Sequence, residues 1–153
     1  MRIFIFLHIA VMFAAVAAAL GPAYLLQRIG RSMDVPAIRR SFALAAPLVS
    51  AVPILYGIGA ALGVVAIFTN GLNPFAPFLL IAYALFLLAG FVFATVNGPW
   101  QKRVTQLAAL SADQVPSPEL NAALRDPRMA AVAWFDPLLV LAFIFDMVVK
   151  PFS

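Results

Sequence analysis

Three polar residues of this chain lie inside otherwise apolar segments, and their types could do chemistry there. His8, the single histidine, lies in the first apolar run, and imidazole is the commonest metal ligand and a frequent axial ligand of haem. Asp136 and Asp146 lie in the last apolar run, and acids inside membrane-spanning segments are functional candidates by default. The chain has no cysteine, which excludes disulfides, iron–sulfur clusters and cysteine nucleophiles.

His8 shares one helical stripe with small residues. Positions 8, 12, 15, 19 and 22 fall on the same face of a helix and read His, Met, Ala, Ala and Pro. Small residues mark helix contacts in membranes, so we expect His8 to point into a bundle and bond a neighbouring helix. The alternative is that His8 binds haem b. The second ligand would be Met147, from the same outer face, Met12, which is less suitable because it shares a helix with His8, or a histidine of a second chain. A metal site needs several ligands, and no metal site is expected.

The two aspartates have different expected roles. Asp146 precedes Lys150 by four residues, the spacing of a helical ion pair. Asp136 precedes Pro137, whose nitrogen has no hydrogen to donate to the carbonyl one turn back, so we expect this acid to cap a kink in the helix. The alternative is that Asp136 belongs to a proton relay. The acids lie about 80° apart around a helix and about 15 Å apart along it, so they cannot act as a paired acid and base.

Long apolar segments must position these residues. The 153 residues are 65% hydrophobic and 10% charged, with a mean hydropathy of +1.03, whereas soluble domains are about half apolar and a quarter charged. About 20 residues cross the roughly 30 Å of hydrocarbon in a bilayer. The sequence therefore predicts one all-α domain over residues 1–153, a four-helix transmembrane bundle whose spans lie at about 3–26, 42–68, 78–96 and 129–149.

The connections between the spans carry turn formers and caps. The segment TNGLNPFAP between the second and third spans predicts a short hairpin loop. Asn97, Gly98 and Pro99 are expected to end the third span, and the segment WQKRVTQLAAL that follows predicts a short amphipathic helix on the lipid headgroups. Ser117 and Asp126 each precede a proline and are expected to be N-caps.

Basic residues are divided unequally between the two sides of the predicted bundle. Arg2 and Lys150 alone lie on the side of the termini. The loops at 27–41 and 97–128 hold the other eight, which are Arg28, Arg31, Arg39, Arg40, Lys102, Arg103, Arg125 and Arg128. Because cytoplasmic loops carry an excess of Lys and Arg, we expect both loops in the cytoplasm and both termini outside, in a bacterial inner (plasma) membrane. These scattered charges indicate lipid rather than nucleic acid as the partner.

Small residues recur at the spacing of helix-packing motifs. Gly59 and Gly63 form a GxxxG motif in the second span, and Gly90 with Ala94 forms a looser version in the third. They would bring helices together within the chain or between two copies. No nucleotide loop, zinc motif or nucleophile elbow is present, which favours a protein that is not an enzyme. We therefore expect an accessory subunit of a larger membrane complex or a self-associating bundle; the alternative is a haem-binding redox protein using His8.

Five segments carry a resemblance that covers nearly the whole chain: FLHIAVMFAAV, SMDVPAIRR, APLVSAVPILYGIGAALG, GPWQKRVTQLAAL and DMVVKPF. They resemble a bacterial family of predicted four-helix integral membrane proteins of unknown function. More distantly, His8 after a leucine is similar to the membrane-bound protoporphyrinogen-oxidase-like proteins and the copper-resistance membrane proteins. Only His8 carries over, and the further histidines of a copper site are missing. The resemblance therefore implies the fold and no activity.

Overall fold

The protein is built almost entirely of helices. The computed structural model describes residues 2–112 and 114–150. Their helices are α1 (Arg2–Gly30), α2 (Val35–Thr69), α3 (Pro77–Val92), α4 (Gly98–Leu110), α5 (Pro118–Leu124) and α6 (Pro127–Val149), with a π-helical turn, η1 (Phe93–Asn97), between α3 and α4. Four segments are long and apolar enough to cross a membrane: Arg2–Gly30, Val35–Thr69, Pro77–Leu110 and Pro118–Val149. The predicted all-α chain with four such helices is confirmed.

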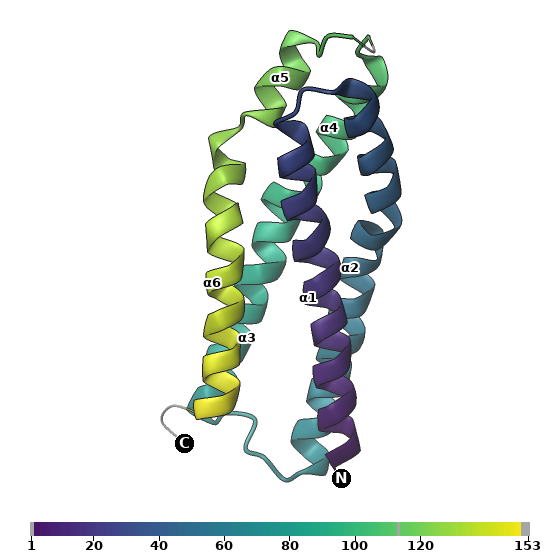
Figure 1. Cartoon of the computed structure of the whole chain (residues 1–153). Helices are drawn as coiled ribbons and strands as arrows, with labels where there is room; N and C mark the ends of the chain where they lie inside the picture. The colour runs from purple at the N-terminus through teal and green to yellow at the C-terminus, as the bar shows by residue number, and fades with distance from the viewer. Residues whose placement is uncertain (1, 113, 151–153) are drawn as a thin grey trace.

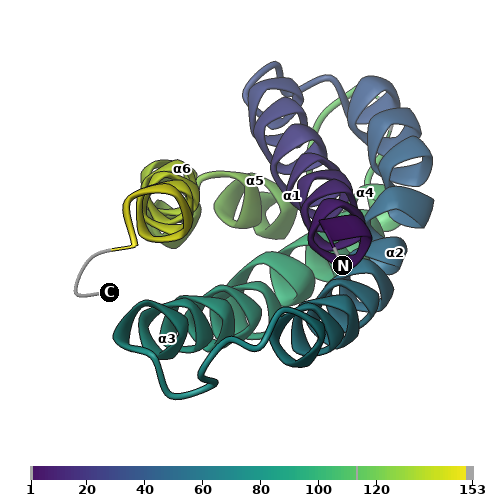
Figure 2. The same cartoon turned by 90° about the horizontal axis from the view of Figure 1, so that it is seen from below.

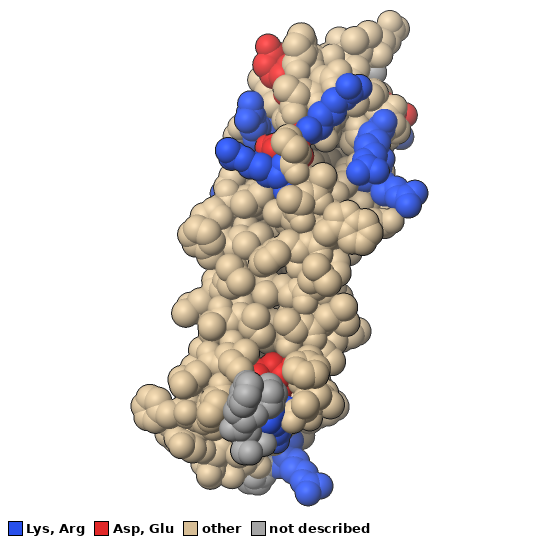
Figure 3. All heavy atoms as spheres, turned by 90° about the vertical axis from the view of Figure 1, so that its left-hand side faces the viewer, with Lys and Arg blue, Asp and Glu red and all other residues tan. Residues whose placement is uncertain are grey.

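The long helices run side by side, so that the start of α1 and the end of α6 lie at one end of the bundle (Figure 1). On the face shown in Figure 3, no charged side chain is visible between the two ends of the bundle. Large apolar side chains are exposed there, among them Phe13, Leu44 and Leu87 at 75%, 78% and 70%. Soluble monomers rarely expose apolar patches beyond a few hundred Å². A lipid bilayer is the solvent that suits this surface, and the chain is a multi-pass membrane protein.

The best-packed part of the bundle lies at the end opposite the termini, where α1 turns into α2 and α5 into α6. Its core consists of Leu26, Val35, Ile38, Phe42, Ala45, Trp100, Val104, Ala108, Leu120, Ala123 and Met129. The Trp100 indole Nε1 donates a 2.8 Å hydrogen bond to the Ala123 carbonyl. The Arg39 guanidinium donates to the carbonyls of Ala108 and Ser111 at 3.1 and 2.9 Å. The segments expected as loops, 27–41 and 97–128, are thus mostly helical and share a core.

The sequence predicted that the third span ends at Asn97, but the structure shows that it continues. The helix passes through η1 into α4 and ends at Leu110. In a regular α-helix the ring of Pro99 would clash with the carbonyl four residues earlier. The wider π-turn, in which the Gly98 N–H bonds the Phe93 carbonyl, accommodates the ring without ending the helix. As a result, α4 continues α3 and packs against α2 and α5, so it is not a separate helix.

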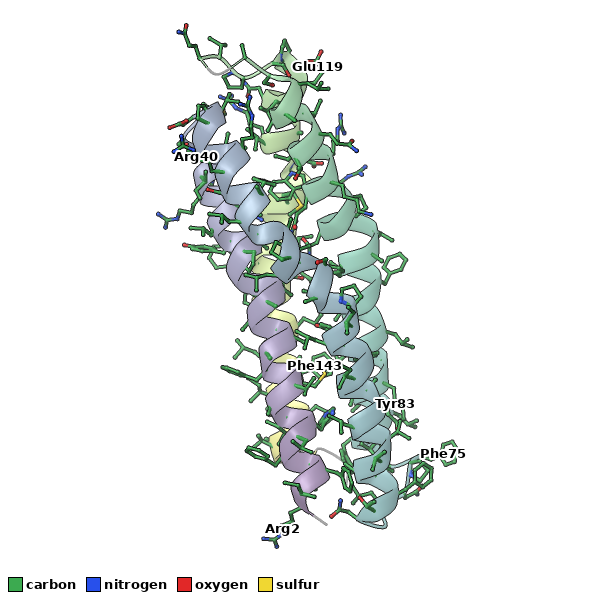
Figure 4. All side chains as sticks on the ribbon, turned by 90° about the vertical axis from the view of Figure 1, so that its right-hand side faces the viewer. Arg2, Arg40, Phe75, Tyr83, Glu119 and Phe143 are labelled. Atoms are coloured by element: carbon green, nitrogen blue, oxygen red, sulfur yellow. The ribbon has the colours of Figure 1, made fainter. Side chains whose placement is uncertain are left out.

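The shorter connections follow their sequence signals. Ser117 and Asp126 are N-caps whose side chains accept hydrogen bonds from the Leu120 and Arg128 amides, as predicted. The hairpin between α2 and α3 turns at Gly71, which has a φ of +64°. The Tyr83 hydroxyl donates to the carbonyl of Pro74 in this hairpin at 3.2 Å. Figure 4 shows Tyr83 near Phe75 at the end that also holds Arg2, and Arg40 with Glu119 at the other.

Packing is sparser in the half of the bundle that holds the termini. Its buried apolar cluster consists of Ile67, Phe78 and Leu79. Here α1 packs along α2 and α6 packs along α3. The two pairs are joined in part by the Tyr56 and Phe86 rings, whose centroids lie 5.4 Å apart. At this end α1 and α6 stand apart in both views (Figures 1 and 2).

Candidate functional site

His8 lies against the GxxxG face of α2. Its Nδ1 is 2.7 Å from the carbonyl oxygen of Gly59. A carbonyl oxygen only accepts, so Nδ1 carries the proton, and in the neutral imidazole Nε2 keeps its lone pair. A Cβ at Gly63 would lie 3.0 Å from the His8 ring, and a Cβ at Gly59 would collide with Met12. The two glycines therefore let α1 approach α2 closely enough for the hydrogen bond to form.

Two further residues of the His8 stripe are buried, Ala15 at 0% exposed and Pro22. Met147 lies elsewhere. It is 37% exposed near the end of α6, the helix that stands apart from α1 at this end and packs beside α3 (Figure 2). His8 and Met147 are thus on helices that do not adjoin where the two residues lie.

Asp136 is bound by a residue that was expected only to end a helix. The Asn97 Nδ2 donates a 3.2 Å hydrogen bond to Asp136 Oδ2. Asn97 is the last residue of η1 and is 6% exposed. Its amide oxygen is buried and has no hydrogen-bond partner in the part of the chain that the structure describes. The side-chain bond of Asp136 thus goes to a neighbouring helix rather than to the kink at Pro137.

A cavity of about 170 Å³ adjoins this pair. It lies between α1, η1 and α6, and its polar lining consists of Tyr24, Gln27, Asn97 and Asp136. The Gln27 Nε2 donates to the Met129 carbonyl at 3.1 Å, and the Tyr24 hydroxyl accepts from Arg28 Nη2 at 3.1 Å. Three helical segments distant in sequence therefore bring amide, hydroxyl and carboxyl groups to one pocket between α1, η1 and α6.

The predicted ion pair of Asp146 with Lys150 is wrong. α6 ends at Val149, and Lys150 has a left-handed φ of 48°, so its side chain leaves the helical spacing. The Lys150 Nζ lies 5.5 Å from the centroid of the Phe78 ring. Asp146 is 2% exposed, and neither carboxylate oxygen has a hydrogen-bond partner among the residues with described positions.

The two small-residue motifs have different surroundings. Gly59 is buried beneath Met12 of α1. Gly90 and Ala94 are exposed, and a Cβ at Gly90 would meet no atom of the described residues within 4 Å. One motif is thus used inside the bundle, and the other lies on its outer surface.

Asn97 and Gln27 were not expected as site residues. Each is a polar residue at the edge of an apolar run, which is also what a span boundary looks like. The sequence signal that distinguishes them is their position relative to Asp136: in a four-span bundle these three residues lie at similar depths, near the end that carries the Arg-rich segments. They line one cavity only because α1 packs against α6 and because the π-turn η1 sets the rotation of Asn97 about its helix.

No group of three or more His, Asp or Glu side chains that could hold a metal ion occurs within residues 2–112 and 114–150. No family profile, curated protein or solved structure matches the chain. Its function must therefore be inferred from the placement of its own residues.

Proposed function

We propose that this multi-pass membrane protein is a non-catalytic component that associates, through the outer face of α3, with a second copy of itself or with another membrane subunit. The supporting observation is the exposed position of Gly90 and Ala94. In a bilayer, small residues at this spacing allow two helix backbones to approach closely, and packing rather than the hydrophobic effect then holds the helices together.

The residues around the motif fit such a contact. Leu87, Gly90, Phe91 and Ala94 follow the i, i+3, i+4, i+7 spacing of a single helix face. Leu87 and Phe91 are 70% and 64% exposed, so two large side chains alternate with two small ones along the stripe. A glycine inside a helix costs about 1 kcal/mol relative to alanine, and no described residue comes within 4 Å of a Cβ placed at Gly90. A partner helix would supply the missing contact.

The test replaces the small residue by a large one. Gly90→Leu should abolish association, because the added side chain separates the two backbones. Gly57→Leu is the matched control, since Gly57 is also an exposed helical glycine with open space around its Cβ position. Native mass spectrometry of protein released from membranes in mild detergent measures the assembly. A wild-type protein that is monomeric and carries no co-purified subunit contradicts the proposal, as does a Gly90→Leu protein that assembles like the wild type.

We also propose the bacterial inner membrane as the location, with both termini outside the cytoplasm. The support is the position of the basic residues, which gather at the end of the bundle away from the termini (Figure 3). Membership of the four-helix family described above stays a prediction.

One observation favours a haem-binding redox protein as a second candidate. The hydrogen bond from His8 Nδ1 to the Gly59 carbonyl leaves Nε2 as the ligating nitrogen, the arrangement usual for metal-bound histidines. A second axial ligand would have to come from another chain, because Met147 lies on a helix that stands apart. Protein from haem-sufficient cells should then show a Soret band that His8→Ala removes. A colourless, folded wild type eliminates this candidate.

A further inference from the structure

We propose that Asp136, Asn97 and Gln27 form a binding site for a monovalent cation, a small protonated amine or a hydrated alkali ion, in the cavity between α1, η1 and α6. The site does not depend on the association proposed for α3. It uses the π-turn, the buried amide and the intramembrane acid, none of which the proposed function requires.

The two amide side chains at the cavity each use the nitrogen in a hydrogen bond and leave the oxygen without a described donor. Asn97 uses Nδ2 on Asp136 Oδ2, so its buried Oδ1 stays without a partner. Gln27 uses Nε2 on the Met129 carbonyl, which leaves its Oε1. The second carboxylate oxygen of Asp136 receives no hydrogen bond from the described residues. The three residues Gln27, Asn97 and Asp136, which line the cavity, therefore each have a side-chain oxygen to which no described residue donates a hydrogen bond.

The acid also lacks a positive partner. Arg28, the cation next to the lining residue Gln27, lies 5.5 Å from the centroid of the Tyr24 ring and bonds its hydroxyl. No ion pair to Asp136 forms in residues 2–112 and 114–150. An unpaired charge is costly in an apolar medium, and so is a buried acceptor without a donor, such as Asn97 Oδ1. A positively charged occupant balances the carboxylate. It also satisfies the free oxygens, either by donating hydrogen bonds to them or, as a metal ion, by being coordinated by them.

Charge and size define the class of occupant. One carboxylate balances a single positive charge, whereas Ca²⁺ prefers 6–8 oxygen ligands, usually with several carboxylates. The volume of about 170 Å³ is close to that of an engineered cavity of about 150 Å³ that binds benzene. It therefore has room for an ammonium group with a short apolar substituent, which the apolar side chains of α1 and α6 would contact, or for an alkali ion with part of its water.

The experiment measures the thermal unfolding of the full-length protein in detergent through its tryptophan fluorescence. Sodium chloride, methylammonium chloride and tetramethylammonium chloride are compared at equal ionic strength. Tetramethylammonium has the same charge but no N–H group, and it cannot donate. We expect a saturable rise in Tm, about 3–6 °C at ten times the Kd, with sodium, with methylammonium or with both, and no such rise with tetramethylammonium. A response to one of the first two identifies the cation.

Asp136→Asn should remove this response, whereas Asp146→Asn, which neutralises the other intramembrane acid, should keep it. If Asp136→Asn does not fold, Gln27→Leu provides the second variant and should raise the half-saturating concentration at least fivefold. Equal Tm curves in all three salts overturn the proposal, because the cavity then holds only water beside a neutral acid. A response that survives Asp136→Asn, or one that Asp146→Asn also removes, overturns it as well.

Discussion

His8 and Asp146 are both polar residues inside apolar helices, but their surroundings differ. His8 has a hydrogen-bond acceptor at 2.7 Å on the next helix. Asp146 is more deeply buried and has no partner among the described residues. Replacement of the two by apolar or neutral residues should therefore change stability in opposite directions.

For His8→Leu we expect a loss of about 0.6 kcal/mol, and at most about 1.7 kcal/mol, in the free energy of unfolding; these are the average and the largest value measured for hydrogen bonds between membrane helices. The lost interaction is the bond to the Gly59 carbonyl. Unfolding in mixed micelles with increasing denaturing detergent measures it. Met12→Leu is the control, since it conserves volume on the same face of α1. An unchanged His8→Leu protein would show that packing alone holds α1 on α2.

For Asp146→Asn we expect a gain of about 1–3 kcal/mol, because the substitution removes the cost of keeping a buried carboxylate without hydrogen bonds. The same unfolding assay measures the gain. Asp126→Asn is a suitable comparison: its side chain caps α6 at the aqueous end, and an asparagine caps equally well. A less stable Asp146→Asn protein would mean that the carboxylate has a favourable partner in the membrane.

At the scale of the helices, the glycines of α2 are not equivalent. Gly63 faces the His8 ring, whereas Gly57, less than two turns away, faces open space. Gly63→Leu should lower the free energy of unfolding by about 1–3 kcal/mol through overpacking. Gly57→Leu should be neutral or slightly stabilising, because leucine is the better helix former. Similar losses in both proteins would place the contact of α1 elsewhere on α2.

The four spans could be predicted from the sequence because hydropathy over some 20 residues sums many small contributions, and the cap residues because each acts on its own neighbours. Predictions failed where one residue decides the geometry. Asn97 and Pro99 predict a helix end unless a π-turn accommodates the proline. Lys150 could pair with Asp146 only if the helix continued past Val149. The contact of Asn97 with Asp136 joins residues 39 apart in sequence, and no local pattern contains it.

At the scale of the whole molecule, the two ends differ in charge and in packing. The end with the larger core carries eight of the ten basic residues, and the end with the termini carries the other two, Arg2 and Lys150. This asymmetry predicts the orientation in the membrane. Since the chain has no cysteine, single cysteines can report each side without background.

We expect Phe75→Cys to react with a membrane-impermeant maleimide in intact cells, and Val115→Cys to react only after the inner membrane is permeabilised. Both positions are well exposed, at 75% and 68%, so accessibility on the bundle itself does not limit the reaction. Labelling is measured as a shift in mass. The reverse pattern would place the termini in the cytoplasm.

The π-turn also determines which helices each half of the third span packs against. A π-turn contains one residue more than an α-turn, so it rotates every later side chain by about 100° relative to those before it. Below the turn, α3 packs on α6; beyond it, α4 packs on α2 and α5. Deleting one residue, for example Ala94, would restore a uniform α-helix. Such a helix could not pack against α6 with its first half and against α2 and α5 with its second half. A single inserted residue thus lets one continuous helix pack against two different sets of helices. The rotation at the π-turn, rather than the sequence of either half, determines which helices become neighbours.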